Sequence, residues 1–381
     1  MIALSRPLRV AMAALRPGAA DLPDLARGLR EADWHEVIGI ANLHLVTPAM
    51  YLNLREAGLL GILPSEAAEF LWRVHELNAR RNERMVTQLA ELLVALRADG
   101  IESVLLKAAA DLPTTPEPRL GERIASDLDV LIRPADLKRV RRGLRRLGYA
   151  RDGDDVGRHS DGNYVRPGEP AGIDLHLRVE EEDELLPAAK MWDRSVALHW
   201  RGTELRIPCP EHRVVHLVLH DMLHHGGYYS GAPRLRALHD LRRFIDAWHG
   251  RLDWRVVDTH FQNLRLGHVL DAHLLAAHRL LGAAWPLSRP PSAAGRFAVL
   301  RFAATTNGIL PRFVLLGVAK ATRGLAWHRM YRLYGPGGGS LATWRLRHLV
   351  HWTVGGAANR LRGHGLRMQE KAPTTDRSAG P

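Results

Sequence analysis

The sequence has a single cysteine, Cys209, so no disulfide can form within the chain. This fits a reducing compartment. The chain also lacks any apolar run of the ~18–20 residues that are needed to span a bilayer. Near the N-terminus, Arg6, Arg9 and Arg16 interrupt the apolar patches, so the continuous apolar segment of a secretory signal is missing. We therefore expect a soluble, cytoplasmic protein without a transmembrane segment.

Several common catalytic motifs are missing as well. No Walker-A, Gly-x-Gly-x-x-Gly or Gly-x-Ser-x-Gly pattern occurs, which argues against P-loop, dinucleotide-binding and serine-hydrolase sites of the usual kind. The glycine-rich stretch "GPGGGS" at 335–340 lacks the Lys-Ser/Thr ending of a phosphate-binding loop. It is interpreted as a flexible break.

Of the 381 residues, 46% are hydrophobic and 25% are charged, which is typical of globular proteins with a sizeable core. The net charge of +12 is concentrated at one end: residues 301–381 hold thirteen Lys/Arg and two acidic residues, a balance of +11. A basic segment dotted with tryptophans can bind nucleic acid or an anionic membrane surface. A solvated helical face is the favoured alternative, because arginine greatly outnumbers lysine along the whole chain.

The hydrophobic pattern predicts an α+β protein whose small mixed sheet is flanked by helical regions. Strands are predicted over 101–106, over 172–179 and on both sides of the Arg201-Gly202 turn, and a helix is predicted from Pro134 to Gly148. We predict an N-terminal helical region (1–82), an α/β core (83–208), a helical domain packing on that core (209–285), and a basic helical region with a disordered C-terminal tail (286–381).

The stretch "ASDLDVLIRP" at 125–134 places two carboxylates in an aliphatic strand. Side chains alternate along a strand, so Asp127 and Asp129 share one face, about 7 Å apart. The alternating apolar residues bury the opposite face, so the aspartates are expected to line a cleft or the surface. Two carboxylates this close repel each other, whereas Mg²⁺ prefers such hard oxygen ligands. Asp174 in "GIDLHL" is the best candidate for a third carboxylate, because its strand neighbours are apolar.

The order of these motifs resembles the polymerase-β-type nucleotidyltransferase superfamily, and within it a bacterial branch called the uncharacterised nucleotidyltransferase family. That branch reads Leu-Lys-Gly, a loop with proline and arginine, Ser-Asp-x-Asp, a helix ending in Gly-Tyr, and hydrophobic-Asp-Leu-His. The resemblance covers about residues 75–280. The matching positions are Lys107, Arg123, Ser126, Asp127, Asp129, Leu131, Gly148, Tyr149, Asp174 and His176.

The resemblance implies that the three aspartates hold two Mg²⁺ ions, or Mn²⁺ in their place, that bridge the triphosphate of an NTP. Asp174 would share a metal and act as general base toward the acceptor hydroxyl. Lys107 and Arg123 would neutralise phosphate charge, and Ser126 would hydrogen-bond phosphate or orient Asp127.

One position departs from the family pattern. The branch has Lys-Gly where this chain has Lys107-Ala108. Glycine permits close backbone approach and positive φ, whereas alanine disfavours the latter. A weakened triphosphate cradle, or loss of turnover, is therefore an expectation to test. The three intact aspartates argue for retained activity.

Histidines recur at four-residue spacing at 212, 216, 220 and 224, with another at 225. Such spacing can bind zinc, but the glutamate of His-Glu-x-x-His is missing, so we favour a helix packed on the catalytic sheet with one or two histidines lining the cleft. His220 and Asp240 match polar positions of the family and are secondary site candidates. His176 shares the face of Asp174, and either a place beside the metal or a core position fits the pattern.

These observations predict a Mg²⁺-dependent nucleotidyltransferase that transfers NMP from an NTP, with ATP as the first candidate. The acceptor is a hydroxyl on a small molecule, a protein or an RNA, and fold analogy cannot choose among them. Segment 301–371 slightly favours an anionic partner. The rival hypothesis is a catalytically silent protein that keeps the fold for binding or regulation, with RNA bound through its basic C-terminal region.

Overall fold

A computed structural model describes residues 4–153 and 159–306. The helices are α1 (Arg6–Ala14), α2 (Leu22–Ala26), α3 (Glu31–Leu43), α4 (Thr47–Glu56), α5 (Ser65–Ala98), α6 (Lys107–Asp111), α7 (Leu137–Arg146), α8 (Ala188–Asp193), α9 (Pro210–Leu219), α10 (Gly227–Ser230), α11 (Leu235–Ala247), α12 (Trp254–Asn263), α13 (Gly267–Leu281) and α14 (Ala293–Thr306). The strands are β1 (Ser103–Leu105), β2 (Asp127–Ile132), β3 (Ala150–Asp152), β4 (Ser160–Val165), β5 (Gly172–His176), β6 (Ser195–Trp200) and β7 (Thr203–Pro208). The predictions for the glycine-rich break and for the basic region beyond residue 306 lie outside the described residues.

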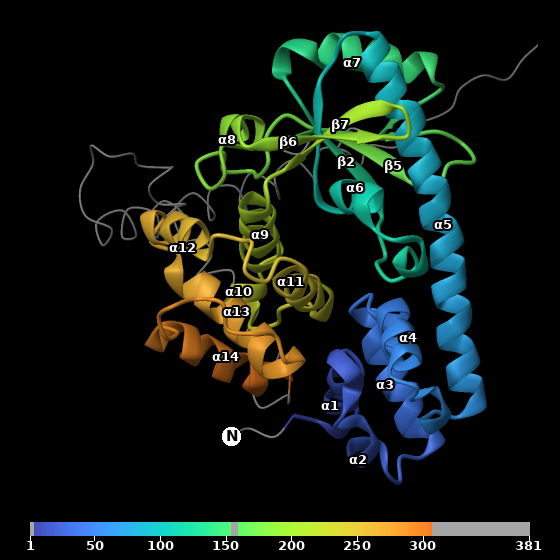
Figure 1. Cartoon of the computed structure of the whole chain (residues 1–381), viewed down its shortest axis with the longest axis vertical. Coiled ribbons are helices and arrows are strands. Elements are labelled where there is room, and N and C mark those ends of the chain that lie inside the picture. The colour runs from blue at the N-terminus through green and yellow to red at the C-terminus, as the bar shows by residue number, and fades with distance from the viewer. Residues whose placement is uncertain (1–3, 154–158, 307–381) are drawn as a thin grey trace, which may run out of the picture. The chain divides into compact units, whose positions relative to one another are not determined.

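Seven strands form one mixed sheet in the order β3-β4-β5-β2-β1-β7-β6 (Figure 1). At its centre β2 runs parallel to β5 and antiparallel to β1. The β6–β7 hairpin turns at Arg201 (φ 47°) and Gly202 (φ 74°), and two consecutive positive φ angles are the signature of a tight type I′ turn. This hairpin and the α+β class are as predicted.

One face of the sheet packs against α5 and α7. Leu128, Val130 and Ile132 of β2 are at most 1% exposed and belong to a hydrophobic cluster that includes Leu89 of α5 and Leu144 of α7. Burying each such side chain contributes about 1.5–3 kcal/mol, so this layer fixes which face of β2 is turned away from the helices. The aspartates are therefore held on the other face.

That other face is more buried than the sequence suggested. Asp127 is half-buried and fits the predicted cleft, but Asp129 is only 1% exposed and Leu131 is fully buried. The expectation that this whole face opens to a cleft or to the surface is wrong for Asp129. Ion pairs with two cationic side chains, described below, compensate for its burial.

In the sequence, helical segments precede the first strand of the sheet and follow its last strand. Helix α5 is continuous across residues 82–83, where the sequence suggested a boundary. It ends at Ala98, and Gly100 (φ 64°) follows in the left-handed conformation that is common just after a helix. The described residues belong to a single compact unit. Among them no single helix is long and apolar enough to cross a membrane, although α3 and α4, bent by 117°, pass this test as a pair.

Candidate active site

The register between β2 and β5 brings the three predicted aspartates together. Asp129 lies directly beside Asp174 in this parallel pair, and Asp127 precedes Asp129 by two residues on the same face. The carboxyl groups therefore come from neighbouring strands of a well-packed sheet. Such a support holds their positions more firmly than a loop would.

Asp129 is the most buried of the three carboxylates. Its Oδ1 accepts from Lys107 Nζ at 2.7 Å and from His176 Nε2 at 3.0 Å. Burial alone would raise the pKa of Asp129, but these two cations hold it well below its usual range. Its Oδ2 is buried and has no hydrogen-bond partner among the described residues. One oxygen of an ionised, buried carboxylate is therefore left to coordinate or accept from something else.

His176 links two of the aspartates. Its Nε2 lies 3.0 Å from Asp129 Oδ1 and 3.0 Å from Asp174 Oδ2, and its Nδ1 lies 3.3 Å from the carbonyl oxygen of Arg178. Although full burial favours the neutral ring, hydrogen bonds to the two carboxylates raise the pKa of His176 to about 9. Both ring nitrogens therefore donate at neutral pH. His176 is thus a core histidine that is also part of the carboxylate cluster.

The other two aspartates, Asp127 and Asp174, differ in how far neighbouring groups stabilise their negative charges. Asp127 accepts from Ser126 Oγ at 2.8 Å, so the serine orients the first aspartate, one of its two predicted roles. Burial and the neighbouring Asp129 carboxylate raise the pKa of Asp127. Asp174 accepts from Ser160 Oγ, and despite its burial the hydrogen bond from His176 lowers its pKa. Asp127 is therefore the carboxylate that would gain most from an added cation.

Lys107 begins α6 in an unusual backbone conformation. Its φ is 46°, in the left-handed region, which costs a non-glycine residue about 1–2 kcal/mol. Ala108 is not among the residues with positive φ, so the conformational part of the concern about this alanine does not apply to its position. In this conformation the ammonium group of Lys107 lies 2.7 Å from Asp129 Oδ1. Backbone strain of this kind is concentrated at functional sites.

Helix α5 holds the loop that precedes β2. Asn78 and Asn82 donate to the carbonyl oxygen of Arg123 at 3.0 and 2.9 Å. Arg81 donates to the carbonyl oxygens of Ala125 and Ser126, and to that of Pro170 at 2.9 Å. These bonds satisfy carbonyl groups of a loop without regular structure. They also fix Arg123 and Ser126 relative to the aspartates.

A pocket of about 550 Å³ opens beside the cluster and is lined by Lys107, Ala108, Arg123, His220 and Asp240. The three aspartates are not among its lining residues, so Lys107 connects the pocket to the carboxylates. Eight Lys/Arg and three Asp residues line the pocket, a balance of +5. Arg123 Nε donates to Asp240 Oδ2 at 3.0 Å, so these two predicted site residues form an ion pair in the pocket wall.

Several pocket and cluster residues were not identified from the sequence. Asp111 pairs with Arg213 and lies 3.7 Å from Arg123, and Ser160 supports Asp174. Arg236 donates to the carbonyl oxygen of Ile124 at 3.3 Å and forms no ion pair with any described residue. No motif marks these residues, because their partners are distant in sequence. Only the polar "HSDGNYV" stretch around Ser160, beside the predicted strand, was a local signal.

One ligand atom each from Asp129, Asp174 and His176 lies within 4.8 Å of the others. Because the protonated His176 has no free lone pair, the carboxylates are the groups that could hold a metal ion, which would take the place of the imidazolium. Two carboxylates of adjacent strands, with a third two residues away, fit a hard divalent cation. The partnerless Oδ2 of Asp129 supports this fit. In the structure, the cationic side chains of Lys107 and His176 lie next to these carboxylates and supply the positive charge there.

Comparison with known protein families gives a match over most of the chain. The model of a family described as "Uncharacterised nucleotidyltransferase" matches residues 30–282, which include the carboxylate cluster and all of the pocket lining. No curated protein and no solved structure matches the chain. The match covers well over half of the sequence and agrees with the motif order, so the chain belongs to the uncharacterised nucleotidyltransferase family.

Proposed function

We propose that this protein transfers NMP from an NTP, with ATP as the first candidate, to a hydroxyl group of an acceptor: the hydroxyl oxygen bonds to the α-phosphorus, the α–β phosphoanhydride bond breaks, and pyrophosphate leaves. The observation that carries the proposal is the convergence of Asp127, Asp129 and Asp174, with one buried carboxylate oxygen of Asp129 left without a partner. Family membership supports nucleotidyl transfer in general terms. The nucleotide, the metal and the acceptor are the specific parts of the proposal.

The three aspartates would hold Mg²⁺, as two ions, or Mn²⁺ in its place. When bound, the metal would supply positive charge to the triphosphate oxygens and to the attacking hydroxyl oxygen. Asp129 and Asp174 already share His176 between them, so the same oxygens are prearranged around one point. This prearrangement lowers the cost of ordering ligands when a metal arrives.

The chain's own cations would bind and orient the nucleotide. Lys107 lines the pocket and contacts Asp129, so its ammonium group can approach a phosphate without leaving the cluster. Arg123 presents a planar guanidinium at the pocket wall, where Asp240 and Asp111 hold it. Asp174 would accept the proton of the acceptor hydroxyl at a carboxylate oxygen. The catalytic contribution of these residues would be positioning and charge neutralisation.

The pocket favours an anionic ligand. Its lining carries a balance of +5, and Arg236 is half-buried without an acidic partner among the described residues. Burial and the nearby Arg123 lower the pKa of Arg236, which means that its charge is under-compensated. A triphosphate or a phosphorylated acceptor would supply the missing negative charge.

Intact-mass measurement of candidate acceptors, incubated with the full chain, Mg²⁺ and each NTP in turn, tests this proposal. A gain of one NMP identifies nucleotide and acceptor together. The double variant Asp127→Asn, Asp129→Asn should abolish the gain, while Asp193→Asn, at an exposed position on α8, should leave it unchanged. Calorimetric titration with Mg-NTPs tests the binding step separately. If none of the NTPs binds to the wild-type protein, the proposal fails.

A catalytically silent binding or regulatory protein is the second candidate. Two observations favour it: Lys107 and His176 already offset two of the three carboxylate charges, and Ala108 is a lining residue of the pocket at the position where the sequence pattern of the family has glycine. NTP binding without transfer to any acceptor would support this candidate. RNA binding through the basic C-terminal region would show a steep salt dependence that survives the aspartate changes.

A further inference from the structure

A cluster of histidines lies at the end of α9, apart from the aspartates. Helix α9 continues into a π-helical turn, His220–His224, and the N–H of His225 donates to the carbonyl oxygen of His220 at 2.9 Å. In an α-helix, residues five apart point about 140° away from each other. The wider turn closed by an i→i+5 bond brings them one above the other. The π-helical turn therefore places His220, His224 and His225 on one side.

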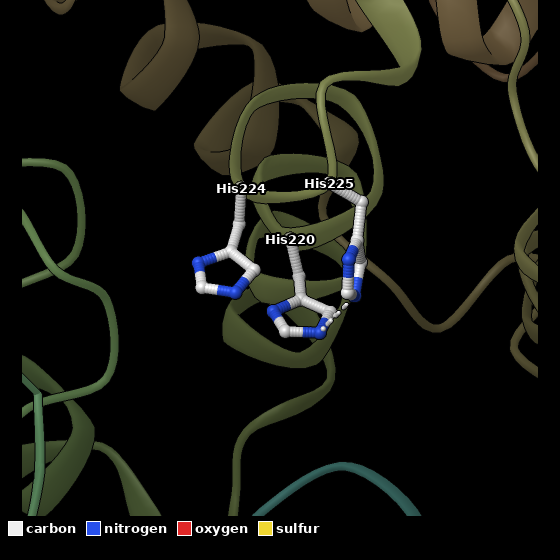
Figure 2. Close-up of side chains that lie close together, drawn as sticks. All are labelled: His220, His224 and His225. Carbon is white, nitrogen blue, oxygen red and sulfur yellow. Dashed lines mark hydrogen bonds between the residues drawn. The ribbon is translucent and has the colours of Figure 1, made fainter. Parts of the chain in front are cut away.

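Figure 2 shows the three rings side by side below the turn. Nε2 of His225 lies 2.9 Å from Nε2 of His220, and one ligand atom from each of the three residues lies within 4.8 Å of the others. His220 and His224 are half-buried and His225 is exposed, so the cluster is open to solvent on one side. Nitrogen ligands around a tetrahedral Zn²⁺ lie about 3.3 Å apart, which is close to the 2.9 Å between His220 and His225.

A second group of possible ligands, Glu180 and His216, lies next to His220. Glu180 and His216 are 3% and 4% exposed, and Glu180 Oε1 lies 3.6 Å from His216 Nε2, which is too long for a hydrogen bond. Neither atom has a hydrogen-bond partner among the described residues. Their ligand atoms and one from His220 again lie within 4.8 Å of one another. Buried polar groups without partners are rare in proteins, and a bound ion is one arrangement that would satisfy them.

We propose that His220, His224 and His225 form a second metal site, which binds one divalent transition-metal ion, such as Zn²⁺, and leaves a coordination position open. Imidazole nitrogens select Zn²⁺, Co²⁺ or Ni²⁺, whereas the aspartate cluster offers the oxygen ligands that suit Mg²⁺. The rings of His220 and His224 stack at 10°, so binding requires one of them to rotate about χ2. This torsion has a broad energy well, so the rotation is inexpensive.

The proposed site borders the nucleotidyltransferase pocket. His220 lines that pocket, and the ring of His224 packs edge-on against His159, 5.5 Å away, which in turn lies 5.2 Å from His176. An ion on His220 would add positive charge to a wall that already has a balance of +5. The ion's open position is thus available to an anionic group of a ligand in the pocket.

Cobalt provides a test with a readout other than activity. The metal-free full chain is titrated with Co²⁺ in excess Mg²⁺, and visible absorption and calorimetry report geometry and stoichiometry. We expect one Co²⁺ per chain with the intense absorption of a low-coordinate nitrogen site, displaced by Zn²⁺. His220→Ala and His225→Ala should each weaken binding at least about tenfold, because each removes a ligand. His225 is exposed, so its replacement leaves the core intact.

Two matched variants make the test specific. His249→Ala removes an exposed histidine elsewhere and should not change binding, nor should Asp127→Asn with Asp129→Asn. If wild type binds no Co²⁺ or Zn²⁺, or if His225→Ala binds as tightly as wild type, the proposal is wrong. Loss of binding in His216→Ala but not in His225→Ala would likewise overturn it, because it would place the ion at Glu180 and His216. The site is independent of the proposed nucleotidyl transfer, so either can fail alone.

Discussion

The bridging histidine predicts how the stability of the metal-free protein depends on pH. His176 has a pKa of about 9 in the folded chain against a reference value of 6.5. Between these values the folded state holds a proton that the unfolded state has lost. The stabilisation is therefore complete below pH 6.5, decreases as the pH rises toward 9, and is gone above 9. At about 1.4 kcal/mol per pKa unit it amounts to about 3 kcal/mol.

Urea unfolding in EDTA, at intervals from pH 6 to pH 10, measures this effect as the difference between wild type and His176→Gln. The difference should shrink by about 3 kcal/mol across the range. Burial also raises the pKa of Glu180 to about 8, and stability from this group falls between its unfolded value of 4.5 and 8. Both proteins contain Glu180, so most of its contribution cancels in the difference; the nearby His176 charge lowers the pKa of Glu180, so a small change at Glu180 remains. His199→Gln, at an exposed position, is the control. If the unfolding free energies of wild type and His176→Gln changed with pH in parallel, His176 would not be a protonated histidine paired with the carboxylates.

The other predictions concern the cations and the loop. Lys107→Met should lower the free energy of unfolding by about 3–5 kcal/mol in EDTA, because it leaves a buried carboxylate underpaired, and a loss below 1 kcal/mol would contradict the pairing. Arg123→Lys should weaken NTP binding at least about tenfold in calorimetry, because the planar fork is lost; unchanged affinity would remove Arg123 from the phosphate site. Ala108→Gly should increase NTP affinity or turnover if the methyl group crowds the pocket, and a decrease in both would show that alanine is not limiting. Arg81→Ala should destabilise the loop before β2 and lower the unfolding free energy by about 1–3 kcal/mol; faster hydrogen exchange at residues 123–126 reports it locally.

The charge balance of the cluster explains how three carboxylates can coexist without a metal. Lys107 and His176 offset two of the three negative charges, and the remaining excess is greatest at Asp127. Metal binding would then compete with His176 for Asp129 and Asp174. In the metal-free state this pairing keeps the strands aligned, since breaking it without a metal would leave buried charges uncompensated.

The sequence by itself determined the alternation of β2, the third aspartate on β5 and the hairpin at Arg201-Gly202, because these depend on side-chain periodicity and local turn conformation. The motif order was sufficient to assign the family, as the match over 30–282 confirms. Local pattern could not determine that Asp129 would be buried, because burial depends on Lys107 and His176 arriving from other elements. Nor could it place strain at Lys107 instead of Ala108, or align three histidines by a π-helical turn instead of an α-helix. Those features depend on packing between segments that are distant in sequence, and only the tertiary structure decided them.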